Sequence, residues 1–201
     1  MVALRMVNAS SHRDIVAIGA SAGGLPQIRM LLGLLPPDLP AIVLVVLHRP
    51  GTQVSYLREV LAQKSRMPVV EATQGEELLV ATGYLGQPSE HLAVDELIHA
   101  ELLPDPRMSR RGRTIDDLFG SLARHAGPRT IGVVLSGALR DGAKGLAEIK
   151  EAGGITMVQS PEDAEFASMP ESAIAYDGTI DVIAPTADLA RAIEASFSKL
   201  V

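Results

Sequence analysis

Short apolar runs alternate with helix-like segments along almost the whole chain. Runs of strand length predict buried strands at 15–19, 42–47, 69–71, 131–135, 155–159 and 180–183. Apolar residues at helical spacing predict helices at 27–35, 54–64, 115–125, 143–151, 170–176 and 187–197. Segments 78–85 and 91–103 predict short strands in a hairpin excursion. The alternation favours an α/β fold, a doubly wound, mostly parallel, Rossmann-like three-layer sheet with helices on both faces.

Polar residues indicate where some of these helices begin. Thr114 is expected to cap the helix that starts at Ile115, with Asp116 and Asp117 in its first turn. Pro170 is expected to open the 170–176 helix. We expect residues 14–201 to form a single domain, preceded by a flexible head at 1–13.

Composition narrows the functional classes. The 201 residues are 47% hydrophobic but only 3% aromatic, so small aliphatic side chains must fill the core. The chain has no cysteine, which excludes disulfides, a thiolate nucleophile and thiolate metal sites. A net charge of −6 argues against a nucleic-acid binder. Because no apolar run approaches the roughly 18 residues of a membrane span, we expect a cytoplasmic protein without membrane insertion.

Three reactive residue types follow three of the predicted strands. Ser21 follows the strand at 15–19 within a glycine-rich turn, His48 follows 42–47, and Asp141 lies just beyond 131–135. The carboxyl ends of parallel strands form the binding edge of a doubly wound sheet. Serine, histidine and aspartate brought to that edge predict a nucleophilic hydrolase.

The roles follow from the chemistry of each group. Ser21 needs His48 to take its proton and return it to the leaving group, and Asp141 would orient the imidazole. Backbone N–H groups near Ala22 and in the turn at 137–139 could hold the oxyanion.

Other interpretations of the same residues are weaker. Ser21 alone could be a helix N-cap. The segment 19–23 fits the G-x-S-x-G elbow of α/β-hydrolases, but the last histidine, His125, precedes the acid. A nucleotide cofactor is not expected, because Ser21 replaces the second glycine of G-x-G-x-x-G and His48 stands where an acid should be. We expect no metal, since His91 and His99 lack a carboxylate partner in the sequence pattern.

The order of motifs resembles the catalytic domain of chemotaxis receptor methylesterases, protein-glutamate methylesterases of the CheB type. The resemblance runs from about Asp14 to Ser196. Its matching segments are G-A-S-A-G-G at 19–24, the hairpin segment at 84–92 with His91 kept, P-R-T-I-G-V-V-L-S-G at 128–137, L-R-D-G-A-K-G at 139–145 and D-A-E-F-A-S-M-P at 163–170. The resemblance implies Ser21 as nucleophile, His48 as base and Asp141 as acid. It also implies that Ala22, Gly23, Ala138, Leu139 and His91 line the oxyanion and substrate site.

The chain departs from the family pattern around the predicted site. Ala22 replaces a threonine, Ala138 a methionine and Leu139 a glycine, while Gly86-Gln87 replace Ala-Pro. Leucine does not easily take a backbone angle that glycine favours. A binding module that kept the fold and lost useful catalysis, or a hydrolase of another ester or amide, therefore stays open.

The resemblance implies removal of methyl groups from glutamate methyl esters on chemoreceptors, with methanol released, and also glutamine deamidation. No cofactor is implied. The expected partners are methylated cytoplasmic receptor helices, and a cluster of four arginines could dock them: Arg107, Arg110, Arg111 and Arg113. Family enzymes usually carry a receiver domain, for which this chain has no room. We expect a free-standing catalytic domain with an unknown regulatory partner.

Overall fold

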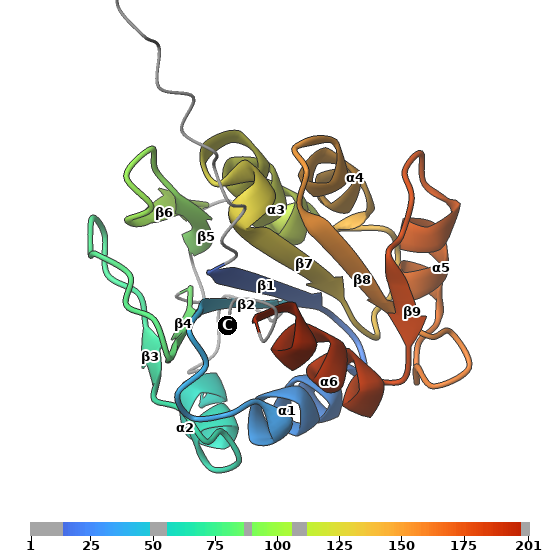
Figure 1. The fold of residues 1–201 in the computed structure, drawn as a ribbon, viewed down its shortest axis with the longest axis horizontal. Helices are drawn as coiled ribbons and strands as arrows, with labels where there is room; N and C mark the ends of the chain where they lie inside the picture. Colours follow the sequence, from blue (N-terminus) through green and yellow to red (C-terminus); the bar gives the residue numbers. More distant parts are fainter. Residues whose placement is uncertain (1–13, 49–55, 87–89, 106–111, 198–201) are drawn as a thin grey trace, which may run out of the picture.

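A seven-stranded sheet forms the centre of the computed structural model, which describes residues 14–48, 56–86, 90–105 and 112–197 (Figure 1). The strand order is β3-β4-β2-β1-β7-β8-β9, and every pairing is parallel. The strands are β1 Ile15–Ala20, β2 Ile42–Leu47, β3 Val69–Glu71, β4 Thr82–Leu85, β7 Thr130–Val134, β8 Ile155–Gln159 and β9 Val182–Ala184. The chain builds outward from β1 to β2 and later returns to β7, so β1 lies at the topological switch point.

Helices cover both faces of this sheet, which confirms the doubly wound α/β fold (Figure 1). One face carries α1 Gly24–Leu34, α2 Leu57–Ala62 and α6 Thr186–Phe197. The other carries α3 Thr114–His125, α4 Ala143–Glu151 and α5 Ser168–Ala175. A 3₁₀ turn at Gly127–Arg129 leads into β7, and an antiparallel pair, β5 Glu90–Val94 and β6 Ala100–Pro104, packs beside α3.

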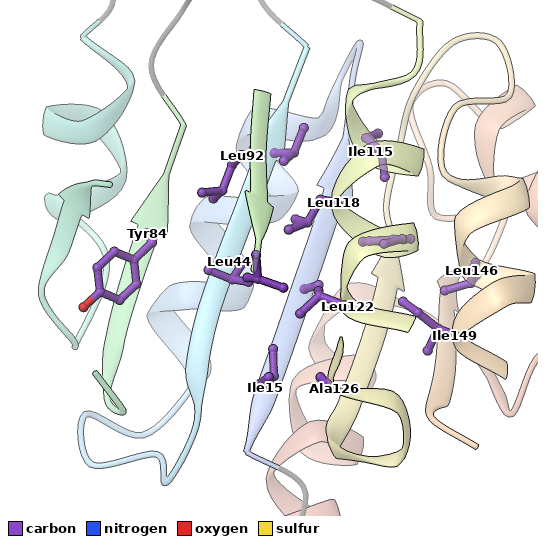
Figure 2. Close-up of a cluster of buried hydrophobic side chains, with 14 of the residues drawn as sticks. Ile15, Leu44, Tyr84, Leu92, Ile115, Leu118, Leu122, Ala126, Leu146 and Ile149 are labelled. Carbon is purple, nitrogen blue, oxygen red and sulfur yellow. The ribbon is translucent and has the colours of Figure 1, made fainter. Parts of the chain in front are cut away.

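The alternation of side chains along the strands divides the core into two layers. All six residues of β1 are buried, with Ile15 and Ala17 in the layer under α3 and Val16 and Ile18 in the layer under α1. Figure 2 shows Ile15, Leu44 and Leu122 among the buried side chains between the sheet and α3. Successive side chains of a strand point to opposite faces, so a strand covered on both faces is continuously apolar.

The predicted hairpin is wrong in one respect. The segment 82–85 does not pair with 91–103, because it forms β4 inside the sheet between β2 and β3. Tyr84 and Leu85 are both buried and face different core layers, which suits a central strand better than an excursion. The hairpin lies wholly within the later segment, where the Asp95 carboxylate accepts hydrogen bonds from the N–H groups of Leu97 and His99 at the turn.

Two helices begin two or more residues earlier than the sequence predicts. Helix α1 starts at Gly24 and not at residue 27, because the turn after β1 is short and the Gly24 N–H donates to the Ser21 carbonyl. Helix α5 starts at Ser168, so Pro170 lies inside its first turn.

No helix within the described ranges is long and apolar enough to cross a membrane. Residues 1–13, expected to form a flexible head, lie outside those ranges.

Candidate active site

Ser21 lies in the tight turn that joins β1 to α1. Its N–H donates to the Ser136 carbonyl at 3.0 Å, which ties the turn to the end of β7. Gly23 has a φ of 69°, and a Cβ there would lie 2.9 Å from atoms of Phe166 and Ser136. Only glycine fits this backbone and this space, so the turn fixes Ser21 at the carboxyl end of β1.

His48 is delivered by the neighbouring strand. Its N–H donates to the Ala20 carbonyl at 3.1 Å, one residue past the last β1–β2 pair. The Nδ1 atom of the ring lies 3.1 Å from Ser21 Oγ. The parallel register of β1 and β2 therefore places a base beside the serine hydroxyl, across 27 residues of sequence.

Asp141 completes a hydrogen-bonded chain from the far side of His48. Its Oδ2 lies 2.6 Å from His48 Nε2, and the residue is only 2% exposed. The carboxylate also accepts hydrogen bonds from the backbone N–H groups of Ile115 at 2.9 Å and Asp116 at 3.0 Å. Asp141 is thus held by the N-terminus of α3, where the helix dipole favours negative charge.

The expected capping role of Thr114 is wrong. Arg113 is the N-cap residue of α3 and makes no side-chain capping bond, while the Thr114 hydroxyl points to Asp141 Oδ2 at 3.4 Å. A carboxylate from another segment does the capping, because it reaches two free N–H groups of the first turn at once.

These contacts determine the proton positions on His48. A carboxylate at 2.6 Å from Nε2 requires a proton between the two atoms, so the neutral ring carries it on Nε2. Nδ1 then has a free lone pair that accepts the Ser21 hydroxyl proton. The pair can act as nucleophile and general base.

Asp116 caps the start of α4, as Asp141 caps the start of α3. Its Oδ1 accepts hydrogen bonds from the N–H groups of Gly142 at 3.0 Å and Gly145 at 2.8 Å, at the start of α4. Burial raises the pKa of the Asp116 carboxyl, and the nearby Asp141 charge raises it further. The sequence pattern places Asp116 only in the first helical turn, because its pairing depends on how α3 meets α4.

Ser136 is a second residue that sequence analysis missed as part of this site. Its fully buried side chain donates to the Ala22 carbonyl at 2.9 Å and accepts from the Phe166 N–H at 3.0 Å. It thereby joins the serine turn to the loop that follows β8. A serine directly after a buried strand was the available signal.

The hydrogen bonds around Ser21 show which of the expected oxyanion donors are already engaged. The Gly137 N–H donates to the Phe166 carbonyl at 3.0 Å, so it is engaged. The N–H groups of Ala22, Ala138 and Leu139 have no partner within the described part of the chain and stay candidates. Leu139 takes the left-handed conformation that its family position implies, with a φ of 69°.

His91 lies apart from the Ser21, His48 and Asp141 contacts. It is buried on β5, with Nε2 3.3 Å from Asp105 and Nδ1 3.3 Å from Asp117 on α3. These contacts tie the hairpin to α3, and the expected role of His91 in lining the substrate site stays a prediction. His99 pairs with Asp95 at 3.7 Å within the hairpin turn.

The arginine cluster is only partly described. Arg107, Arg110 and Arg111 lie outside the described residues, while Arg113 is exposed at the start of α3, beside the segment that Asp141 caps. In the part of the chain that the structure covers, no group of three or more histidine, aspartate or glutamate side chains could hold a metal ion.

Known proteins similar to this chain share one family assignment. The family model described as CheB methylesterase matches residues 16–193, nearly the whole described chain. The chain belongs to the CheB methylesterase family. The crystal structure of the Thermotoga maritima CheB methylesterase catalytic domain superimposes with a TM-score of 0.83 at 28% identity, covering 92% of this chain and 98% of that one.

Curated relatives carry the same family assignment. A protein-glutamate methylesterase/protein-glutamine glutaminase 1 of Burkholderia pseudomallei is 36% identical over 193 residues, covering 94% of this chain and 52% of that protein. A protein-glutamate methylesterase/protein-glutamine glutaminase of Chromohalobacter salexigens is 39% identical over 177 residues, covering 87% of this chain and 50% of that protein. This CheB-family chain therefore spans about half the length of the curated relatives it matches.

Proposed function

We propose that this chain hydrolyses glutamate methyl esters on chemoreceptors and releases methanol, using Ser21, His48 and Asp141. The hydrogen-bonded chain from Ser21 through His48 to buried Asp141 carries the proposal. The family assignment and the names of the relatives support the substrate and extend it to glutamine deamidation. A methylated receptor is a cytoplasmic partner, so we propose the same compartment for this chain.

The geometry supports a two-step mechanism. Ser21 Oγ attacks the ester carbonyl while its proton passes to His48 Nδ1, and the tetrahedral oxyanion forms beside the candidate donors near Ala22 and Ala138. The C–O bond to the methoxy group then breaks, and the proton on Nδ1 moves to that oxygen to give methanol. A water molecule, deprotonated by His48 Nδ1, then attacks the carbonyl of the acyl-serine ester. The bond to Ser21 Oγ breaks, the proton on Nδ1 returns to Oγ, and the glutamate side chain leaves as a free carboxylic acid that ionises to the carboxylate. Asp141 stabilises the imidazolium in both steps.

Receptor docking through the arginine cluster belongs to the same proposal. Arg113 is exposed next to the start of α3, whose first turn holds Asp141. Four arginines within seven residues of a protein of net charge −6 would attract acidic receptor helices.

The first experiment measures methanol released from a methylated chemoreceptor cytoplasmic fragment by wild type and by Ser21→Ala. We expect release by wild type alone. Equal release by the two proteins would remove Ser21 from the mechanism. A fluorophosphonate probe separates the enzyme from a catalytically silent binding module, because its labelling requires Ser21 as a nucleophile and His48 to activate it.

A further inference from the structure

An apolar wall bounds Ser21 on the side away from His48. Strands β7 and β8 lie on the opposite side of β1 from β2, so the segments that follow them surround Ser21 there. A Cβ at Gly137 would lie 3.0 Å from Ser21 Cβ and 2.5 Å from the methyl carbon of buried Met169. On this side the turn that carries Ser21 therefore packs against the apolar side chain of Met169.

Phe166 is exposed at the edge of this wall. The side chain is 44% exposed, although one ring carbon lies 2.9 Å from where a Cβ of Gly23 would stand. Its backbone is fixed at both ends, since its N–H donates to Ser136 Oγ and its carbonyl accepts from the Gly137 N–H. The ring thus presents an apolar surface against the turn that carries Ser21.

Leu139 is a second exposed apolar side chain at the same edge. It lies two residues after Gly137, which packs on Ser21, and two residues before Asp141, which bonds His48. Consecutive Cα atoms are about 3.8 Å apart, so Leu139 stands within roughly 7.6 Å of each of those Cα positions. Its side chain is 74% exposed and its φ is 69°.

Folding alone does not account for leucine at this position. The backbone conformation is unfavourable for any residue with a branched side chain, and the exposed side chain gains little burial in the free protein. A contact with a bound molecule is what an exposed apolar side chain beside a nucleophile can provide.

We propose that Leu139 and Phe166 form an apolar lip that selects helical peptides with aliphatic residues next to the methyl-esterified glutamate. The inference rests on the proposed function and adds the local sequence preference of its substrate. Positions three and four residues from the ester lie on the same helix face, so their side chains reach the lip when the ester reaches Ser21. Exposed Glu165, whose Cβ also lies 2.9 Å from the Gly23 Cβ position, disfavours an acidic neighbour there.

The test compares two synthetic helical peptides, each with one glutamate methyl ester. One peptide carries leucine three residues before and four residues after the ester, and the other carries glutamine at both positions. We expect kcat/KM of wild type, from methanol release, to favour the leucine peptide on the order of tenfold. Leu139→Asn, which tolerates the left-handed backbone, and Phe166→Ser should each bring that preference to within about threefold.

Two controls isolate the lip. Leu79→Asn removes an equally apolar, 59% exposed leucine that precedes β4 at the other edge of the sheet, and it should keep the full preference. Hydrolysis of p-nitrophenyl acetate, which has no peptide to contact the lip, should stay within about twofold of wild type in Phe166→Ser, while Leu139→Asn is judged only by the ratio of its rates on the two peptides.

The outcomes distinguish the lip from the function on which it rests. Equal hydrolysis of both peptides by wild type overturns the lip and leaves the methylesterase standing. An equal loss on both peptides in Leu139→Asn also overturns it, since Leu139 would then act through the oxyanion turn. Ser21-dependent cleavage of p-nitrophenyl acetate, with no cleavage of the peptides or the receptor fragment, rejects the lip and the proposed function together.

Discussion

At the scale of single residues, Asp141 serves the fold and the site with one carboxylate. One oxygen faces His48 Nε2 and the Ile115 N–H, and the other accepts the Asp116 N–H. The N–H donors keep the carboxylate oriented before any substrate arrives. Orientation of His48 is therefore fixed by the start of a helix.

Asp141→Asn should separate these two tasks. The amide oxygen can still accept an N–H of α3, but the amide cannot anchor the Nε2–H tautomer of His48 as a carboxylate does. We expect kcat/KM for a small ester to fall on the order of 10³–10⁴-fold, with the free energy of unfolding lowered by about 1–2 kcal/mol. Ester assays and urea denaturation measure the two effects. Asp38→Asn, at an exposed position before β2, is the control. A tenfold or smaller loss would contradict the assigned role.

Leu139→Gly should stabilise the protein. A left-handed backbone costs a non-glycine residue about 1–2 kcal/mol, while the added freedom of glycine in the unfolded chain offsets about 0.4–1 kcal/mol. We expect a net gain of about 0.5–1 kcal/mol in urea unfolding, since a 74% exposed side chain loses little burial. Leu79→Gly, at an exposed position without a positive φ, should destabilise. The same sign for both variants would argue against strain at Leu139.

At the scale of elements, α3 and α4 cap each other. Asp141 stands just before α4 and caps α3, while Asp116 in the first turn of α3 caps α4. The two helices approach closely at Gly145, where a Cβ would lie 2.5 Å from Phe119 Cβ. Movement of one helix would thus move the acid that orients His48.

Asp116→Asn should change the pH dependence of stability. The pKa of Asp116 is raised in the folded protein, so its native state binds more protons than the unfolded chain. The contribution of Asp116 to folding stability is complete below the pKa that the carboxyl has in the unfolded chain. It is lost as the pH rises through the pKa of the folded protein. Asparagine keeps an acceptor for Gly142 and Gly145 without charge, so stability of the variant relative to wild type should rise with pH from about 4 to 7.

Thermal unfolding at several pH values checks this sign. Asp116→Ala is the companion variant, because it leaves the Gly142 and Gly145 N–H groups without their partner. We expect it to lose about 1–3 kcal/mol at every pH. A stability difference between Asp116→Asn and wild type that falls with pH would contradict the raised pKa.

At the scale of the whole molecule, the parallel sheet brings distant segments to one edge. Ser21, His48 and Asp141 follow β1, β2 and β7, which are neighbours in space but separated by 27 and 93 residues along the chain. Charge acts at the same scale, because the proposed docking of a receptor helix would depend on the field of the whole surface.

Replacement of the four arginines by serine should weaken receptor docking only. We expect kcat/KM on the receptor fragment to fall several-fold at low salt and to lose most of its dependence on ionic strength, while p-nitrophenyl acetate hydrolysis is unchanged. The substituted residues are Arg107, Arg110, Arg111 and Arg113. A control with the same net charge replaces four exposed arginines elsewhere: Arg58, Arg66, Arg124 and Arg191. Equal effects of the two variants would show that the cluster acts only through the net charge of the protein and not through its position.

The sequence by itself determined the order of elements, the parallel sheet and the residues that carry the family resemblance. Each depends on local patterns, such as the buried run of β1 and the glycines around Ser21. Only the tertiary structure decided that 82–85 joins the sheet, that Asp141 and not Thr114 caps α3, and that Asp116 returns the contact. These depend on which segments meet in space, because a free N–H accepts any carboxylate that packing brings within reach.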